Sequence, residues 1–78
     1  MKPKSAFKSD NVSQAFGKNL RTIRKKKGFK LEQAGELLGV LPNYLSRLER
    51  GESAPNLRFI SKLIKTYGVS ANELFKGV

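Results

Sequence analysis

Hydrophobic residues recur at helical spacing in five separate segments of this chain, and no segment has the two-residue alternation of a strand. The first segment is predicted to begin as a helix near Val12, with Asn11 as its cap, and to end at Gly28. Its apolar residues lie three or four positions apart, so they form one stripe that a core would bury. They are Val12, Phe16, Leu20 and Ile23.

The second and third segments are short and are separated by Gly39. One helix is predicted over 31–38. The next is predicted from Pro42 to about Arg50, because proline suits the first position of a helix. Gly35 costs about 1 kcal/mol relative to alanine inside a helix, and we expect it to permit a close approach of the third helix. Two short helices joined at a steep angle are typical of helix-turn-helix DNA-binding proteins.

The fourth helix is predicted from Leu57 to Tyr67, with Asn56 as its cap and Gly68 as its end. Its apolar residues cover nearly half of the circumference, which is wider than a single core contact needs. A short fifth helix should follow, capped by Ser70 and Glu73 as a capping box. These elements predict an all-α fold, a compact five-helix bundle that contains a helix-turn-helix.

Residues 1–11 are polar and basic without periodicity, whereas 12–78 carry the helical pattern. We interpret the first stretch as a flexible arm. It is either a plain tail or an arm in which Lys2, Lys4 and Lys8 touch DNA phosphates. No apolar run approaches the ~20 residues of a membrane span, so a cytoplasmic protein is expected. If the helix-turn-helix binds DNA, the protein is expected to associate with the nucleoid.

Charge and composition narrow the function further. The 78 residues hold 16 Lys and Arg against 6 acidic residues, a net charge of +10, which favours a polyanionic partner. Histidine and cysteine are both absent, so the usual general base, the thiol nucleophile and the common zinc ligands are missing. We therefore predict no enzyme activity, no metal site and no cofactor.

Three motifs resemble one known family. They are Leu20 to Gly28 (LRTIRKKKG), Tyr44 to Gly51 (YLSRLERG) and Tyr67 to Phe75 (YGVSANELF). Together they make the segment from Phe16 to Val78 similar to the Cro and phage-repressor type of helix-turn-helix domain. Small stand-alone regulators of this type include Cro-like and restriction–modification controller proteins. The start of the second helix departs from the family pattern, since Lys30 and Leu31 stand where a polar cap and glutamine are usual.

The resemblance implies that the third helix contacts base edges in the major groove. The chemistry of two positions suits this role, because Arg47 can bond guanine and Asn43 can bond adenine through two hydrogen bonds each. The alternative is a solvated polar helix face, or, for Leu41, packing at the start of the helix. The implied base-contacting residues are Leu41, Pro42, Asn43, Ser46 and Arg47.

The resemblance also implies an ion pair within the chain and a set of contacts with DNA phosphates. Arg24 is expected to form a partly buried ion pair with Glu49, because an acid on the third helix would otherwise repel phosphate. Phosphate contacts fix the register on the duplex without carrying sequence information. The candidates are Lys30, Tyr44, Arg50, Ser53 and Asn56.

Members of this family usually pair through their last two helices, so we expect a homodimer on a pseudo-palindromic operator. The implied function is a sequence-specific transcriptional regulator, either a repressor or a controller. One alternative is an antitoxin that binds its toxin and represses its own operon, and another is a nucleic-acid binder that uses charge alone. A toxin or polymerase is a possible protein partner, and no membrane role is expected. The predicted dimer residues, which could instead complete the monomer core, are Phe59, Leu74, Phe75 and Val78.

Overall fold

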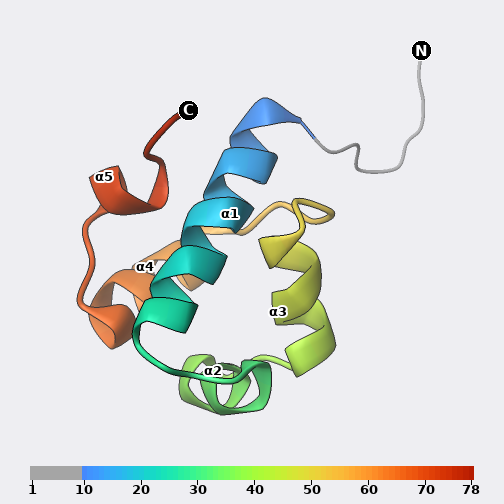
Figure 1. Ribbon diagram of the computed structural model, residues 1–78, viewed down its shortest axis with the longest axis vertical. Helices are drawn as coiled ribbons and strands as arrows, with labels where there is room; N and C mark the ends of the chain where they lie inside the picture. The colour runs from blue at the N-terminus through green and yellow to red at the C-terminus, as the bar shows by residue number, and fades with distance from the viewer. Residues whose placement is uncertain (1–9) are drawn as a thin grey trace.

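The computed structural model describes residues 10–78, which form five helices and no strand. The helices pack into a small bundle in which α1 runs through the middle, with α3 on one side and α5 on the other (Figure 1). The predicted all-α fold is confirmed. The helices are α1 (Asn11–Lys26), α2 (Leu31–Leu38), α3 (Pro42–Glu49), α4 (Leu57–Tyr67) and α5 (Ala71–Leu74).

The start of α1 differs from the prediction by one residue. Asp10, not Asn11, is the cap, and its side chain accepts a hydrogen bond from the backbone N–H of Ser13 at 2.7 Å. This hydrogen bond lowers the pKa of the Asp10 carboxyl. Both residue types are good caps, so the sequence did not distinguish them. Residues 10 and 11 therefore belong to the helix and its cap, whereas the predicted phosphate contacts of Lys2, Lys4 and Lys8 lie outside the described residues.

The remaining helices begin and end where the cap residues predict. Asn56 Oδ1 accepts a hydrogen bond from the N–H of Phe59 at 2.8 Å, and Gly68 ends α4 in the left-handed conformation, with φ of 67°. Ser70 and Glu73 form the predicted capping box at the start of α5. Local sequence signals thus fix the lengths of these short helices.

The hydrophobic core draws side chains from all five helices. Val12 is an exception to the predicted stripe of α1, since 47% of it is exposed, whereas the neighbouring Ser13 is buried. Ile23 is partly buried against the core. The core residues are Phe16, Leu20, Ala34, Leu38, Leu45, Leu48, Phe59, Leu63, Tyr67 and Leu74.

Helices α1 and α3 approach each other closely at Gly17. A β-carbon built at this position would lie 2.3 Å from the carbonyl oxygen of Leu48 and 2.6 Å from that of Glu49. Both atoms belong to the backbone, so a side-chain adjustment could not relieve the overlap. The missing side chain of Gly17 therefore sets how closely α3 approaches α1.

A polar contact holds the C-terminal segment against the side of α1 opposite to α3. The side-chain amide nitrogen of Asn19 donates to the carbonyl oxygens of Leu74 at 2.9 Å and Lys76 at 2.8 Å. Phe75 adds an aromatic contact, with its ring centroid 5.3 Å from that of Phe16. These contacts hold α5 against α1. Within residues 10–78, none of the helices has the length and apolar character that crossing a bilayer requires.

Candidate nucleic-acid interface

The geometry of α2 and α3 is set by two glycines. Gly39 ends α2 in the left-handed conformation, with φ of 71°, which glycine adopts at little cost. A β-carbon on Gly35 would lie 2.7 Å from the carbonyl oxygen of Val40, so only glycine fits beneath the turn. The close approach expected at Gly35 is therefore present, although its nearest atoms belong to the turn and to the start of α3.

The inner side of α3 is anchored, which leaves its outer side free. Leu45 and Leu48 are fully buried, and α3 packs against both α1 and α2. Asn43 and Arg47 are exposed. They lie four residues apart, and on a helix this spacing places them side by side on one face. Both side chains can therefore reach a ligand lying along α3.

The other three residues predicted to contact bases lie beside this pair. Leu41 precedes α3 and is 74% exposed, so the alternative that it packs at the helix start is not what the structure shows. Pro42 is the first residue of α3, as predicted, and Pro42 and Ser46 are half-buried. The start of α3 thus has both polar and apolar groups that are at least partly exposed.

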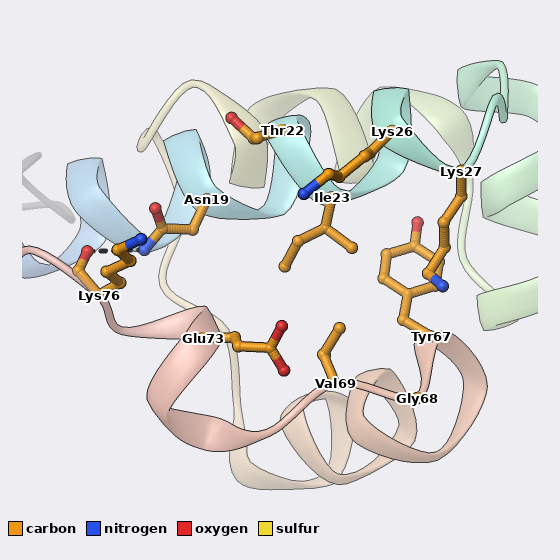
Figure 2. A pocket seen from close by; sticks show the side chains of 10 residues that line it. All are labelled: Asn19, Thr22, Ile23, Lys26, Lys27, Tyr67, Gly68, Val69, Glu73 and Lys76. Carbon is orange, nitrogen blue, oxygen red and sulfur yellow. Dashed lines mark hydrogen bonds between the residues drawn. The ribbon is translucent and has the colours of Figure 1, made fainter.

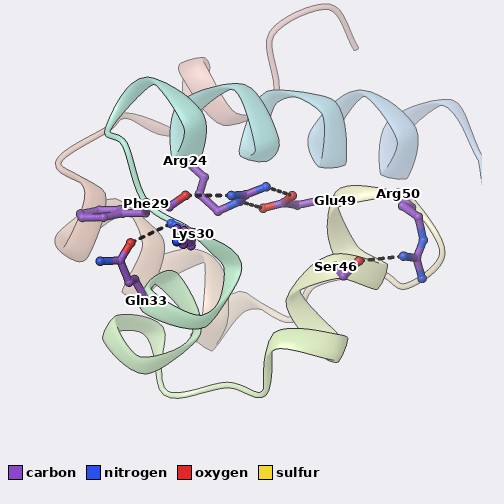
Figure 3. Close-up of polar contacts among 7 residues, drawn as sticks. All are labelled: Arg24, Phe29, Lys30, Gln33, Ser46, Glu49 and Arg50. Carbon is purple, nitrogen blue, oxygen red and sulfur yellow. Dashed lines mark hydrogen bonds and ion pairs between the residues drawn. The ribbon is translucent and has the colours of Figure 1, made fainter.

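Arg24 and Glu49 form a buried ion pair between α1 and α3 (Figure 3). Arg24 Nε donates to Glu49 Oε2 at 2.7 Å, and Nη2 donates to Oε1 at 3.0 Å. A third hydrogen bond, from Nη1 to the carbonyl oxygen of Phe29 at 2.8 Å, joins the turn after α1. Hydrogen bonding to Glu49 raises the pKa of Arg24. The single carboxylate of α3 is therefore turned inward and neutralised.

Arg50 follows α3 and is already bound by neighbouring side chains. Its Nε and Nη2 donate to the two carboxylate oxygens of Glu52 at 2.9 and 3.1 Å. Its Nη1 donates to Ser46 Oγ at 2.7 Å (Figure 3). The sequence predicted Arg50 as a cation available for phosphate, and did not anticipate these partners. These contacts are local, because Glu52 lies only two residues after Arg50 and Ser46 four residues before it. The phosphate contact of Arg50 stays a prediction.

Lys30 and Asn56, predicted to contact phosphate, are exposed residues immediately before α2 and α4. The backbone N–H of Lys30 donates to Gln33 Oε1 at 2.9 Å (Figure 3), which is the return half of a capping box, whereas the Lys30 side chain makes no cap hydrogen bond. Asn56 uses its side-chain oxygen as the cap of α4.

The other two residues predicted to contact phosphate are Tyr44 and Ser53. Tyr44 is half-buried, with its ring packed edge-on against Phe59, and Ser53 lies half-buried in the loop after α3.

The four residues predicted for dimerisation do not form one surface. Phe59 and Leu74 are 6% and 0% exposed and belong to the core of the single chain, which corrects their assignment as interface side chains. Phe75 is half-buried against Phe16. Val78 is 62% exposed, and Leu57, which was not predicted, is 83% exposed. The broad apolar face of α4 is thus largely used within the monomer.

A cavity of about 490 Å³ lies away from α3, between α1 and the segment that joins α4 to α5 (Figure 2). Lys26, Lys27 and Lys76 lie around it together with Glu73, and none of the predicted DNA-contacting residues is among its lining residues. Burial raises the pKa of Tyr67, whose ring forms one wall, to about 12. Among the described residues, no group of three or more carboxylate, histidine or cysteine side chains could hold a metal ion.

Comparison with known proteins agrees with this geometry. The model of the helix-turn-helix family HTH_3 matches residues 20–74. The HTH-type transcriptional regulator DdrOP3 of Deinococcus deserti is 36% identical over 59 residues, which cover 76% of this chain and 46% of that protein. The chain thus spans less than half the length of this relative.

Two solved structures share the fold. The clp gene regulator ClgR from C. glutamicum has a TM-score of 0.78 and 28% identity, with 90% of both chains covered. The restriction-modification controller protein C.AhdI from Aeromonas hydrophila has a TM-score of 0.74 and 34% identity, covering 80% of this chain and 94% of its own. The relatives are transcriptional regulators and not enzymes. The chain therefore belongs to the helix-turn-helix family of DNA-binding transcriptional regulators.

Proposed function

We propose that this chain binds a specific double-stranded DNA sequence, with α3 in the major groove. The observation that carries the proposal is the position of Asn43 and Arg47, which are exposed together on a helix whose opposite side is anchored by Leu45 and Leu48. An anchored helix holds its outward side chains in fixed register with base edges. Arg47 would bond guanine O6 and N7, and Asn43 would bond adenine N6 and N7.

The neighbouring residues support this binding mode. Ser46 adds a hydroxyl to the face, while Leu41 and Pro42 offer apolar surface to a thymine methyl group. Phosphates would be held by Lys30, Tyr44, Ser53 and Asn56, together with backbone N–H groups at the starts of α2 and α4. The internal pairing of Glu49 removes the one charge on α3 that would repel the duplex. Binding of this kind would associate the chain with the nucleoid.

Two copies would bind a pseudo-palindromic operator. One α3 reaches only a few base pairs, whereas a dimer places two recognition helices about 34 Å apart on the same face of DNA. The exposed apolar residues available for pairing are Leu57 and Val78, with part of Phe75. The likeness to the controller protein C.AhdI supports a regulatory role, in which the bound protein occludes or contacts polymerase.

Arg47→Ala should weaken binding to the preferred site by about 1–3 kcal/mol, or about 5- to 150-fold, and relax the preference at one base pair. Binding to random duplex should change far less, because base-specific hydrogen bonds contribute little there. Fluorescence anisotropy with both duplexes measures the two affinities. Arg21→Ala is the matched control, since Arg21 is an exposed arginine on α1. An equal loss on both duplexes would show that Arg47 does not distinguish bases.

A further inference from the structure

A chain of three side chains links the loop after α3 to the surface of that helix. Glu52 holds Arg50 through two parallel hydrogen bonds, and the remaining Nη1 of Arg50 donates to the hydroxyl of Ser46. The ion pair is about half exposed, with side-chain exposures of 56% for Arg50 and 52% for Glu52. Arg50 thus connects an acid outside the helix with a residue on its DNA-facing side.

The contact with Arg50 determines the hydrogen-bonding role left to Ser46. A serine hydroxyl has one donor hydrogen and two acceptor lone pairs. A charged guanidinium that donates to Oγ polarises the O–H group and repels other donors, so the hydroxyl becomes a better donor and a poorer acceptor. Ser46 is then suited to base acceptors such as guanine O6 and N7, adenine N7 or thymine O4, and poorly suited to the amino group of cytosine.

Glu52 also controls the charge that Arg50 offers to DNA. The two hydrogen bonds occupy the Nε–Nη2 edge of the guanidinium, one of the two edges that can hold a phosphate through two hydrogen bonds, and the contact with Ser46 engages Nη1, which belongs to the other edge. Arg50 must leave Glu52 before it can bind phosphate in this way. Because phosphate attraction supplies nearly all of the sequence-independent affinity for DNA, the ion pair weakens non-specific binding more than base-specific binding.

We propose that Glu52 is a specificity-determining residue, which holds Arg50 as the positioning partner of Ser46 and withholds its charge from the DNA backbone. This inference rests on the proposed binding of α3 to DNA. It differs from a simple phosphate role for Arg50, because it predicts that removal of an acidic residue improves affinity while discrimination becomes worse.

The test uses Glu52→Gln and a matched control, Glu36→Gln. Glu36 is exposed on α2 and has no side-chain hydrogen bond or ion pair within residues 10–78, so its substitution changes the net charge equally. Affinities for the preferred duplex and for random duplex are measured from 50 to 200 mM salt. Glu52→Gln should bind random duplex about five-fold more tightly at ~150 mM salt, with a salt slope steeper by about 0.9, which corresponds to one additional phosphate contact.

The ratio of preferred to random affinity should fall several-fold in Glu52→Gln and stay unchanged in Glu36→Gln. Ser46→Ala should reduce this ratio in the parent protein and reduce it less in the Glu52→Gln background. An unchanged ratio in Glu52→Gln, or equal effects of the two glutamine variants, would overturn the inference. If the parent protein itself failed to prefer any duplex, the proposed function would fail instead, so the two failures are distinguishable.

Discussion

Arg24→Ala is expected to lower the free energy of unfolding by about 3 kcal/mol, because it leaves the carboxylate of Glu49 buried without its cation. The Glu49 side chain is only 4% exposed, so water cannot replace the lost hydrogen bonds without local opening of the structure. The substitution also removes the hydrogen bond to the carbonyl oxygen of Phe29. The ion pair thus connects α1, α3 and the turn between α1 and α2.

Urea unfolding followed by circular dichroism measures this effect. Arg21→Ala is the control, because it removes the same side chain from an exposed position of the same helix and should change stability by less than ~0.5 kcal/mol. Replacing the pair together, as Arg24→Met with Glu49→Leu, should recover much of the loss, since no charge remains buried. Equal stability of Arg24→Ala and the parent protein would contradict a structural role for the ion pair.

Gly17→Ala should destabilise the fold by about 3 kcal/mol, at the upper end of the range for overpacked cores. The added β-carbon would lie 2.3 Å and 2.6 Å from two backbone oxygens of α3, so the two helices must move apart. That movement would also strain the hydrogen bonds between Arg24 and Glu49, which join the same helices. Alanine normally stabilises a helix relative to glycine, so the predicted sign is opposite to the effect of helix propensity.

Urea unfolding of Gly17→Ala is best compared with Ser61→Ala, since Ser61 is exposed on α4 and the control adds no atoms at a helix contact. The control should remain within ~0.5 kcal/mol of the parent protein. Gly17→Ala should also shift the position of α3, which chemical-shift changes at Leu48 and Glu49 would report. A stability equal to or above that of the parent protein would show that α1 and α3 are less closely packed than the structure indicates.

The sequence predicted most helix boundaries because each depends on local chemistry. Gly39 and Gly68 end helices in the left-handed conformation, Pro42 begins one, and Asn56 and Ser70 cap two more. These signals act over three or four residues and need no knowledge of the tertiary structure. The predicted start of α1 lay one residue too late, because two adjacent residues, Asp10 and Asn11, are both suitable caps.

The candidate site was only partly predictable, because side-chain partners depend on tertiary placement. The wide apolar stripe on α4 did not reveal that Phe59 packs inside the monomer. A hydrophobic pattern shows which face of a helix is buried, but it does not show whether the same chain or a second copy buries that face. The close packing at Gly17 was also missed, although a glycine within an apolar helical stripe is a signal that favours helix–helix contact. The partners of Arg50 depended on the conformations of Glu52 and Ser46, which spacing does not determine.

Selection of bound duplexes from a random DNA pool is the most direct measurement of the central claim, that the exposed face of α3 chooses the DNA sequence. The parent protein should enrich a two-fold symmetric consensus whose half-sites lie about one helical turn apart. Arg47→Ala should lose the preference at one symmetric pair of positions while the remaining consensus persists. Failure of the parent protein to enrich any sequence, or an identical consensus for Arg47→Ala, would contradict the account.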